Sequence, residues 1–328
     1  MNFAFSWEEF YDNTYDKYNS VSFSDPYKYY ISDITSSEGS RFIDFYKDSQ
    51  TSIKILIESS LFYSNHIGYT TSSKGYNGYG GNIYICSYLD IVQNKVCSYN
   101  CSASIYGQHC YIITISNSIQ YKNYNYISSY SDLGQTGVGK SPIHHGHGEI
   151  IINNANISNC RTSGECGIYI ELTKFPGNVS QTSFINNSAT SNNCILFQGS
   201  KPYLFIKLNI VNNKVIDQIF YINFHDLSII ESIFKNNTAT NTFYTNGYNV
   251  YLIHSIVEIN GSTANVNTDS LKTDVFENII STTISGKCCF SMIITQKTKI
   301  NHVDILITLF KSLSSSFFEE GLSEYIFL

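Results

Sequence analysis

One short phrase recurs along the chain: an apolar residue, two variable residues and then Asn. Copies end at Asn65, Asn94, Asn187, Asn213, Asn237 and Asn260, and residues 157–160 form a copy in which Cys160 replaces Asn. From Cys160 on, the copies follow one another at steps of 27, 26, 24 and 23 residues, and the first two are 29 apart. A repeat of this period indicates stacked supersecondary units, so it restricts the possible folds more than any other feature.

Short strands surround each copy of the phrase. β-Branched and aromatic residues dominate runs such as residues 53–57, 111–115 and 203–206, and Gly or Asn clusters separate the runs. This pattern is typical of strands, and a repeat with two or three short strands is one coil of a solenoid. An antiparallel sandwich is the alternative, because its strands are also short and closely spaced. The sequence predicts an all-β, right-handed parallel β-helix of about eight coils.

Stacked coils give the repeated residues definite positions. An inward Phe, Ile or Val forms an apolar column, and the corner Asn tolerates a left-handed backbone conformation and can hydrogen-bond to the Asn of the next coil. The outward positions of such coils need few charges. The composition agrees with this, since 42% of the residues are hydrophobic, only 14% are charged and 27 are Tyr. We expect an N-terminal cap over residues 1–50, a β-helix over 51–300 with an inserted loop at 128–149, and a C-terminal cap over 301–328.

Charge and hydropathy argue against a nucleic-acid partner and against a membrane-spanning segment. A net charge of −6 and a pI near 5.7 leave no basic surface for nucleic acid. No apolar run reaches the roughly 18 residues of a spanning helix, so we expect no transmembrane segment. Residues 1–9 lack a basic region ahead of an apolar stretch, so no Sec-type signal peptide is visible.

Nine cysteines at uneven spacing do not form a disulfide framework, and no C-x-x-C occurs. Cys97, Cys101 and Cys110 are close together in the sequence. A metal site, a local disulfide and buried free thiols all remain open for these three residues. The redox compartment is therefore not determined.

Residues 134–141 match the phosphate-loop pattern G-x-x-x-x-G-K-[ST] through Gly134, Gly139, Lys140 and Ser141. Such a loop binds phosphate where it joins a strand to the N-terminus of a helix. Two glycines soon after the match oppose a helix. We interpret the match as a chance Gly-rich loop between coils, and we expect no nucleotide and no other cofactor.

His144, His145 and His147 are weak candidates for binding Zn²⁺ or Cu²⁺. Glycines interleave them, so the segment does not hold a tetrahedral geometry. We expect adventitious affinity rather than a metal site.

Polysaccharide lyases and hydrolases built on β-helices are the enzymatic alternative. A lyase needs Ca²⁺-binding carboxylates and a basic residue, and a hydrolase needs paired carboxylates. The chain has only two arginines, and most acidic residues of the coils stand isolated. Glu231 and Glu258 are 27 residues apart and could stack, although a solvated column accounts for them equally well. We expect no catalytic residues.

Tyrosines crowd one region, at positions 76, 79, 84, 88, 99, 106 and 111, followed by 121, 124, 126 and 130. Exposed aromatic rows can stack sugars or anchor a protein partner. The half-buried faces of ordinary strands are the plainer interpretation.

Phe-x-x-Asn together with a Gly-Gly-apolar motif is the repeat signature of the polymorphic outer-membrane-protein-like group of right-handed parallel β-helix surface proteins. The chain resembles this group at Phe62/Asn65, Phe184/Asn187, Phe234/Asn237 and Gly80-Gly81-Asn82-Ile83, over roughly residues 53 to 265. It has a single Gly-Gly motif, Ile or Val at several Phe positions and no autotransporter barrel, which corresponds to a divergent, barrel-less, protist branch. The resemblance implies a cell-surface, adhesion role and carries over no catalytic residue.

The expected function is therefore that of a non-enzymatic surface protein, adhesin-like, whose partner is a carbohydrate or a host-surface protein. A β-helix carbohydrate-active enzyme and an intracellular solenoid scaffold are the alternatives. The scaffold gains support from the missing signal peptide and the unpaired cysteines.

Overall fold

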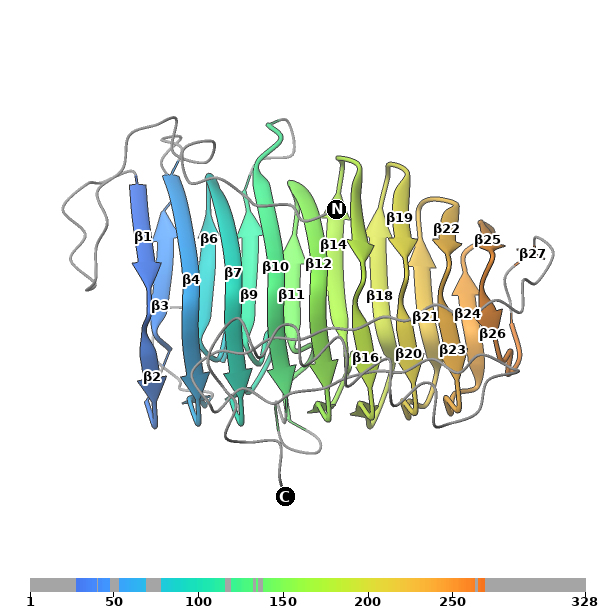
Figure 1. Ribbon diagram of the computed structural model, residues 1–328, viewed down its shortest axis with the longest axis horizontal. Coiled ribbons are helices and arrows are strands. Elements are labelled where there is room, and N and C mark those ends of the chain that lie inside the picture. Colours follow the sequence, from blue (N-terminus) through green and yellow to red (C-terminus); the bar gives the residue numbers. More distant parts are fainter. Residues whose placement is uncertain are drawn as a thin grey trace, which may run out of the picture.

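The computed structural model describes residues 28–39, 41–47, 53–68, 78–115, 119–131, 134, 138–262 and 265–268. Their strands wind into a parallel β-helix, as predicted (Figure 1). One coil runs through β12 (Glu149–Ser158), β13 (Arg161–Thr162) and β14 (Ile168–Thr173), and the next begins at β15 (Gly177–Ser180). β12 pairs with β15 in parallel, so each coil stacks on the one before it.

Two long sheets enclose the interior. The front sheet orders β1 (Lys28–Ser32), β4 (Ile53–Tyr63), β7 (Leu89–Tyr99), β10 (Lys122–Ser131), β12, β15, β19 (Tyr203–Ile206), β22 (Leu227–Ile230), β25 (Asn249–Ile253) and β27 (Asn265–Thr268). It also includes β2 (Thr35–Ser37), β16 (Ser183–Ile185), β20 (Asn209–Val211), β23 (Ile233–Lys235) and β26 (Ile256–Val257). The back sheet orders β3 (Ile43–Lys47), β6 (Ile83–Ser87), β9 (Cys110–Thr114), β11 (Ile143–Gly146), β14, β18 (Asn193–Gly199), β21 (Gln218–Asn223) and β24 (Asn241–Thr245). Two small pairs, β5 (His66–Ile67) with β8 (Ser102–Ala103) and β13 with β17 (Ser188–Ala189), lie at the corners.

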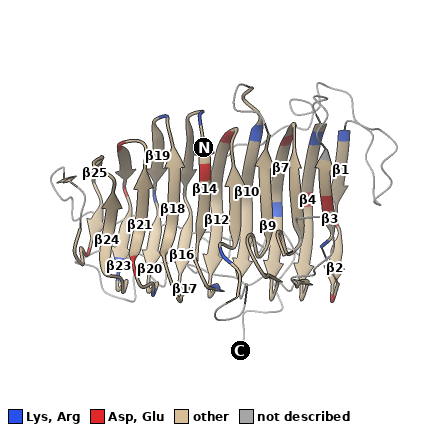
Figure 2. Ribbon diagram, turned by 180° about the vertical axis from the view of Figure 1, so that it is seen from behind, with Lys and Arg blue, Asp and Glu red and all other residues tan. Residues whose placement is uncertain are grey.

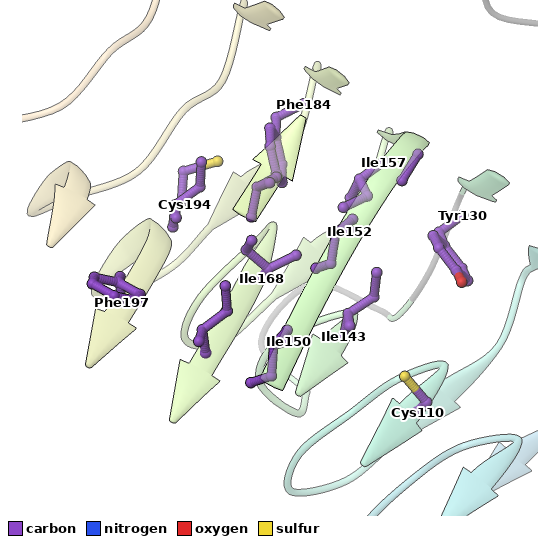
Figure 3. Close-up of a cluster of buried hydrophobic side chains, with 14 of the residues drawn as sticks. Cys110, Tyr130, Ile143, Ile150, Ile152, Ile157, Ile168, Phe184, Cys194 and Phe197 are labelled. Atoms are coloured by element: carbon purple, nitrogen blue, oxygen red, sulfur yellow. The ribbon is translucent and has the colours of Figure 1, made fainter. Parts of the chain in front are cut away.

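Apolar columns fill the space between the two sheets. One column of the back sheet runs through Ile143, Ile168, Ile195, Phe220 and Phe243, all 0% exposed. Figure 3 shows side chains of β12 directed from the front sheet toward Ile143 and Ile168. One coil alone could not bury these groups, so stability arises from contacts between neighbouring coils.

The repeated asparagines form the predicted ladder in the later coils. Asn187 Nδ2 donates to Asn213 Oδ1 at 3.0 Å, and Asn213 Nδ2 donates to Asn237 Oδ1 at 3.1 Å. The left-handed conformation belongs to the preceding residue, as at Asn186 (φ 53°) and Asn212 (φ 57°). Asn tolerates this conformation, but the ladder residues Asn187 and Asn213 do not adopt it. The preceding residue turns the chain, which points the ladder amide inward.

Asn94 was assigned to the wrong phase of the repeat. It lies within β7, where it pairs with Glu58 rather than with a corner residue. Tyr63 pairs with Tyr99, so the position equivalent to Asn65 is Cys101. An apolar-x-x-Asn phrase arises by chance in an Asn-rich strand, and only register separates it from a true corner.

The structure also moves two expected boundaries. β1 pairs with β4 and β3 pairs with β6, so the described coils include residues 28–47, within the segment expected to be a cap. The loop expected over 128–149 contains the end of β10, all of β11 and the start of β12, and the interruption is confined to the segment between β10 and β11. The expected C-terminal cap over 301–328 lies outside the described residues. Within the described ranges, no helix has the length and apolarity of a membrane span.

Candidate functional site

The back sheet carries a row of aromatic side chains on its outer face. Tyr84, Tyr111, His144 and Tyr169 occupy one register column across β6, β9, β11 and β14. They alternate along their strands with core residues such as Ile143 and Ile168, so they point away from the interior. A second row beside it contains Tyr79 and Tyr106. We call these six residues the tyrosine–histidine face.

The rings of this face pack on one another. Tyr84 and Tyr111 stack with centroids 5.7 Å apart and planes 7° apart, and Tyr79 stacks on Tyr106 at 5.9 Å. The His144 ring lies 4.5 Å from Tyr111, 4.4 Å from Tyr169 and 5.1 Å from Tyr106. Tyr84 and His144 are only 1% and 2% exposed, whereas the other four rings are partly exposed. The outer boundary of the face therefore consists of phenol rings and hydroxyls.

Three charged side chains surround these rings. Arg41 lies 4.7 Å from the Tyr84 centroid, and Lys140 Nζ lies 5.2 Å from the Tyr106 centroid. Glu171 Oε2 is 2.7 Å from His144 Nε2, and this hydrogen bond lowers the pKa of the Glu171 carboxyl. Burial raises the pKa values of Tyr111 and Tyr169, with the Glu171 charge as the next cause, so both phenols stay protonated and can donate.

Elsewhere the back sheet is nearly neutral. Figure 2 shows few charged residues on this side of the molecule, most of them near strand ends. In the later coils the aromatic column continues only as Tyr221 stacked on Tyr244 at 5.1 Å. The tyrosine–histidine face is thus the place on this sheet where aromatic, hydroxyl and charged groups come together.

The residues of the phosphate-loop pattern have other partners. Strand β11, not a helix, follows Ser141. Ser141 is buried and its Oγ donates to Glu165 Oε2 at 3.1 Å, while Lys140 Nζ donates to the Tyr106 hydroxyl at 3.4 Å. Gly134 and Gly139 adopt positive φ (78° and 66°) beside Gln108. A helix N-terminus that would bind phosphate is absent from this position.

The three candidate histidines point in different directions. His144 belongs to the outer face, and His145 is buried in the core with Nε2 3.4 Å from Cys110 Sγ. His147 takes a left-handed conformation (φ 57°) at the turn after β11. In the described part of the chain, no three His, Cys, Asp or Glu side chains are grouped as a metal site requires.

The clustered cysteines also separate. Cys101 and Cys110 are buried free thiols, so neither forms a local disulfide. Cys97 is disulfide-bonded and lies on β7, away from the main core.

Sequence reasoning singled out Tyr79, Tyr84, Tyr106 and Tyr111 but missed Arg41, Tyr169 and Glu171. Glu171 pairs in register with Gly146, two residues beyond His144, so the two side chains are not one coil apart. The repeat length therefore does not link them, and only the register of β11 with β14 brings the pair together on the outer face.

The fold and this face define the protein as a parallel β-helix with one aromatic-rich outer surface. No protein-family model matches the chain, and no curated protein or solved structure matches it. The particular activity must therefore be argued from the site alone.

Proposed function

We propose that this protein is a non-enzymatic, adhesin-like β-solenoid that binds a carbohydrate through the tyrosine–histidine face. The observation that carries the proposal is the convergence of Tyr106, Tyr111, Tyr169, Lys140 and Glu171 on one outer surface. Its phenols offer hydroxyl donors and acceptors beside apolar ring edges, which match the alternating hydroxyl and C–H groups of a sugar. A surface location is part of the proposal and rests on the resemblance.

The packing of the rings favours a binding function over a catalytic one. His144 is enclosed by three tyrosine rings and Glu171, so its imidazole cannot reach a substrate. Rings that are already stacked lose little conformational entropy when a ligand arrives, because their positions are fixed beforehand.

The carboxylates that an enzyme would use have structural partners instead. Glu165 accepts from Ser141, and Asp226 accepts from the Asn249 backbone N–H at 2.8 Å. Glu231 and Glu258 do not share a column, because Glu231 follows Ile230, which pairs with Ile253, while Glu258 follows Val257, which pairs with Phe234. These contacts support a binding function over the hydrolase alternative.

A glycan array probed with the full-length protein tests the proposal, followed by titration of any glycan that binds. Tyr106→Ala should weaken binding by about tenfold or more, a loss of at least ~1.4 kcal/mol. Tyr221→Ala, on the same sheet but outside the face, is the matched control and should bind normally. Absence of any glycan binding, or equal loss in both variants, would refute the proposal.

The location is tested separately by protease treatment of intact cells that express a tagged copy. Removal of the tag from outside supports the surface role. A tag that survives until lysis favours the intracellular scaffold.

A further inference from the structure

One corner column of the β-helix is rich in asparagine. It contains the residues that directly follow five front-sheet strands, namely Asn100 after β7, Asn159 after β12, Asn186 after β16, Asn212 after β20 and Asn236 after β23. All five adopt a left-handed conformation, with φ between 51° and 57°, and all five are exposed. We call them the corner asparagines. The strands β16, β20 and β23 end along the lower edge of the molecule in Figure 1.

Three corner asparagines begin N-x-[ST], the acceptor sequence for N-linked glycosylation. They are Asn100, Asn186 and Asn236, followed two residues later by Ser102, Ser188 and Thr238. The other two, Asn159 and Asn212, have Arg161 and Lys214 at that place. Ser188 and Thr238 both bridge to Lys214, so the hydroxyl residues share a column of their own. The repeat therefore presents the acceptor sequence at equivalent positions of different coils.

The side chains of these acceptors face solvent and hold no buried contact. The backbone N–H of Asn186 donates to the Val211 carbonyl at 3.1 Å, and that of Asn236 donates to Glu258 Oε2 at 2.6 Å. Within the described residues, neither of their side-chain amides has a hydrogen-bond partner. Asn100 Nδ2 donates only to a surface hydroxyl, so a sugar on any of the three leaves the coils intact.

The other three acceptor sequences of the chain lie in different surroundings. Asn156 is 1% exposed, and Asn178 is half-buried within β15, where it accepts from Ser180 Oγ at 3.1 Å. Asn260 Nδ2 donates to the Asn237 carbonyl at 2.9 Å, as the ladder asparagines do to theirs. A chain that carried a sugar on Asn156 could not bury that side chain, so it would not reach this fold. The fold thus separates acceptors that tolerate a sugar from acceptors that do not.

An independent observation concerns the compartment. Cys97 is disulfide-bonded. Disulfides form and persist in the oxidising secretory pathway and outside the cell, and they are rare in the cytosol. N-linked sugars also belong to secreted proteins.

We propose that Asn100, Asn186 and Asn236 are N-glycosylated, so that a row of sugar chains lines this corner of the β-helix. The inference rests on the surface location that is part of the proposed function. In the transfer, each Asn Nδ2 loses a proton and bonds to the anomeric carbon of an oligosaccharide carried on a lipid pyrophosphate. The bond from that carbon to the pyrophosphate oxygen breaks, and the lipid pyrophosphate leaves. Asn186 and Asn236 are two coils apart, about 10 Å, which leaves room for both chains.

Site mapping of the full-length, folded protein purified from its own cells tests the proposal. Enzymatic release of N-glycans in heavy-oxygen water converts each occupied Asn to a labelled Asp, which peptide mass spectrometry locates. We expect the label at Asn100, Asn186 and Asn236, and none at Asn156. A missing label at Asn186 or Asn236, or a label at Asn156, would overturn the proposal.

Two variants test the column itself. Ser188→Ala should abolish the label at Asn186 and keep it at Asn236, while the ladder residue Asn187 is unchanged. Lys214→Thr completes the acceptor sequence at Asn212 and should add a label there, because this residue has the same exposed, left-handed geometry. No gain at Asn212, or loss at both sites in Ser188→Ala, would contradict the assignment to the corner.

The result separates this inference from the proposed function. A protein that binds glycans on the array and is reached by external protease, yet carries no N-glycan, overturns the inference alone. A tag that stays protected until lysis, with no label at any corner, overturns the surface location together with the inference.

Discussion

The earlier and later coils of this β-helix fill the same interior in different ways. The later coils stack phenylalanines, with Phe184, Phe205, Phe220, Phe234 and Phe243 all 0% exposed. The earlier coils place Gln93, His109, Asn125, Tyr130 and His145 in the interior, also at 0%. Gln93 and Asn125 stand in one column between Ile57 and Ile152, positions that are apolar in other coils.

The polar interior persists because most of its groups have partners. His109 Nε2 lies 2.9 Å from Gln93 Oε1, and His109 Nδ1 lies 3.0 Å from Asn82 Nδ2. With an amide oxygen on one side and an amide nitrogen on the other, the imidazole is neutral and donates through Nε2. The comparison teaches that register between coils is maintained by backbone pairing, so the interior can be either apolar or a closed polar network.

The largest loss of stability should follow the removal of one ring from the phenylalanine stack of the later coils. Phe220 packs 4.9 Å from Phe205 and 6.3 Å from both Phe234 and Phe243, measured between ring centroids. Phe220→Ala should destabilise the later coils by about 3–5 kcal/mol, because transfer and cavity costs add. Denaturant unfolding checks this, with the 47% exposed Phe224→Ala as a control that should change stability little. A cost below about 1 kcal/mol would show that the stack is not tightly packed.

The second largest loss of stability should follow a substitution in the asparagine ladder. Asn213 accepts from the backbone and side chain of Asn187, and its Nδ2 donates to the Phe184 carbonyl and to Asn237. Asn213→Ala should cost about 2–3 kcal/mol, because it leaves buried donors and acceptors unpaired. Asn212→Gly, at the exposed left-handed position beside it, should change the free energy of unfolding by only a few tenths of a kcal/mol. Similar costs for both variants would contradict a special role for the ladder.

The earlier coils should respond to acid more than the later ones. Burial, followed by a neighbouring histidine charge, lowers the pKa values of His109 and His145 to about 3. Both values lie below the ordinary 6.5, so the unfolded chain binds more protons as the pH falls. The stabilisation is present above pH 6.5 and declines below it, by about 1.4 kcal/mol per pH unit for each histidine.

Amide hydrogen exchange in β9 and β11 between pH 6.5 and 5.5 measures this decline. His145→Ile would continue the column of Ile112 and Ile170 and should remove about half of the decline. An unchanged pH dependence in this variant would show that His145 does not titrate as assigned.

The smallest expected effect is a gain in stability. Asn123 is buried between Ile91 and Ile150 in the front sheet, and neither amide atom has a hydrogen-bond partner. Asn123→Ile should stabilise the earlier coils by about 1 kcal/mol, since it removes an unpaired polar group and extends an apolar column. Thermal unfolding of both proteins checks the sign. A loss of stability would mean that an internal water satisfies the amide.

Much of the fold could be predicted from the sequence because the repeat is local. The steps after Cys160 placed Asn187, Asn213 and Asn237 correctly, since each later coil is nearly constant in length. The earlier coils have variable lengths, so the same phrase misplaced Asn94 and concealed Cys101 as its corner equivalent. The site was only partly predictable. The sequence shows that the tyrosines cluster in one region, but it does not show which of them share one outer face of the sheet.

By itself, the sequence determined that the chain forms stacked parallel coils with apolar columns and an asparagine ladder. These features need only the period of the repeat and the residue types within one coil. The tertiary structure decided that His144 points outward to Glu171 while His145 points into the core, and that Leu56 is buried while Leu204 is 41% exposed. The reason is that side-chain direction in a strand alternates at every residue, so it depends on register between coils, which no single coil encodes.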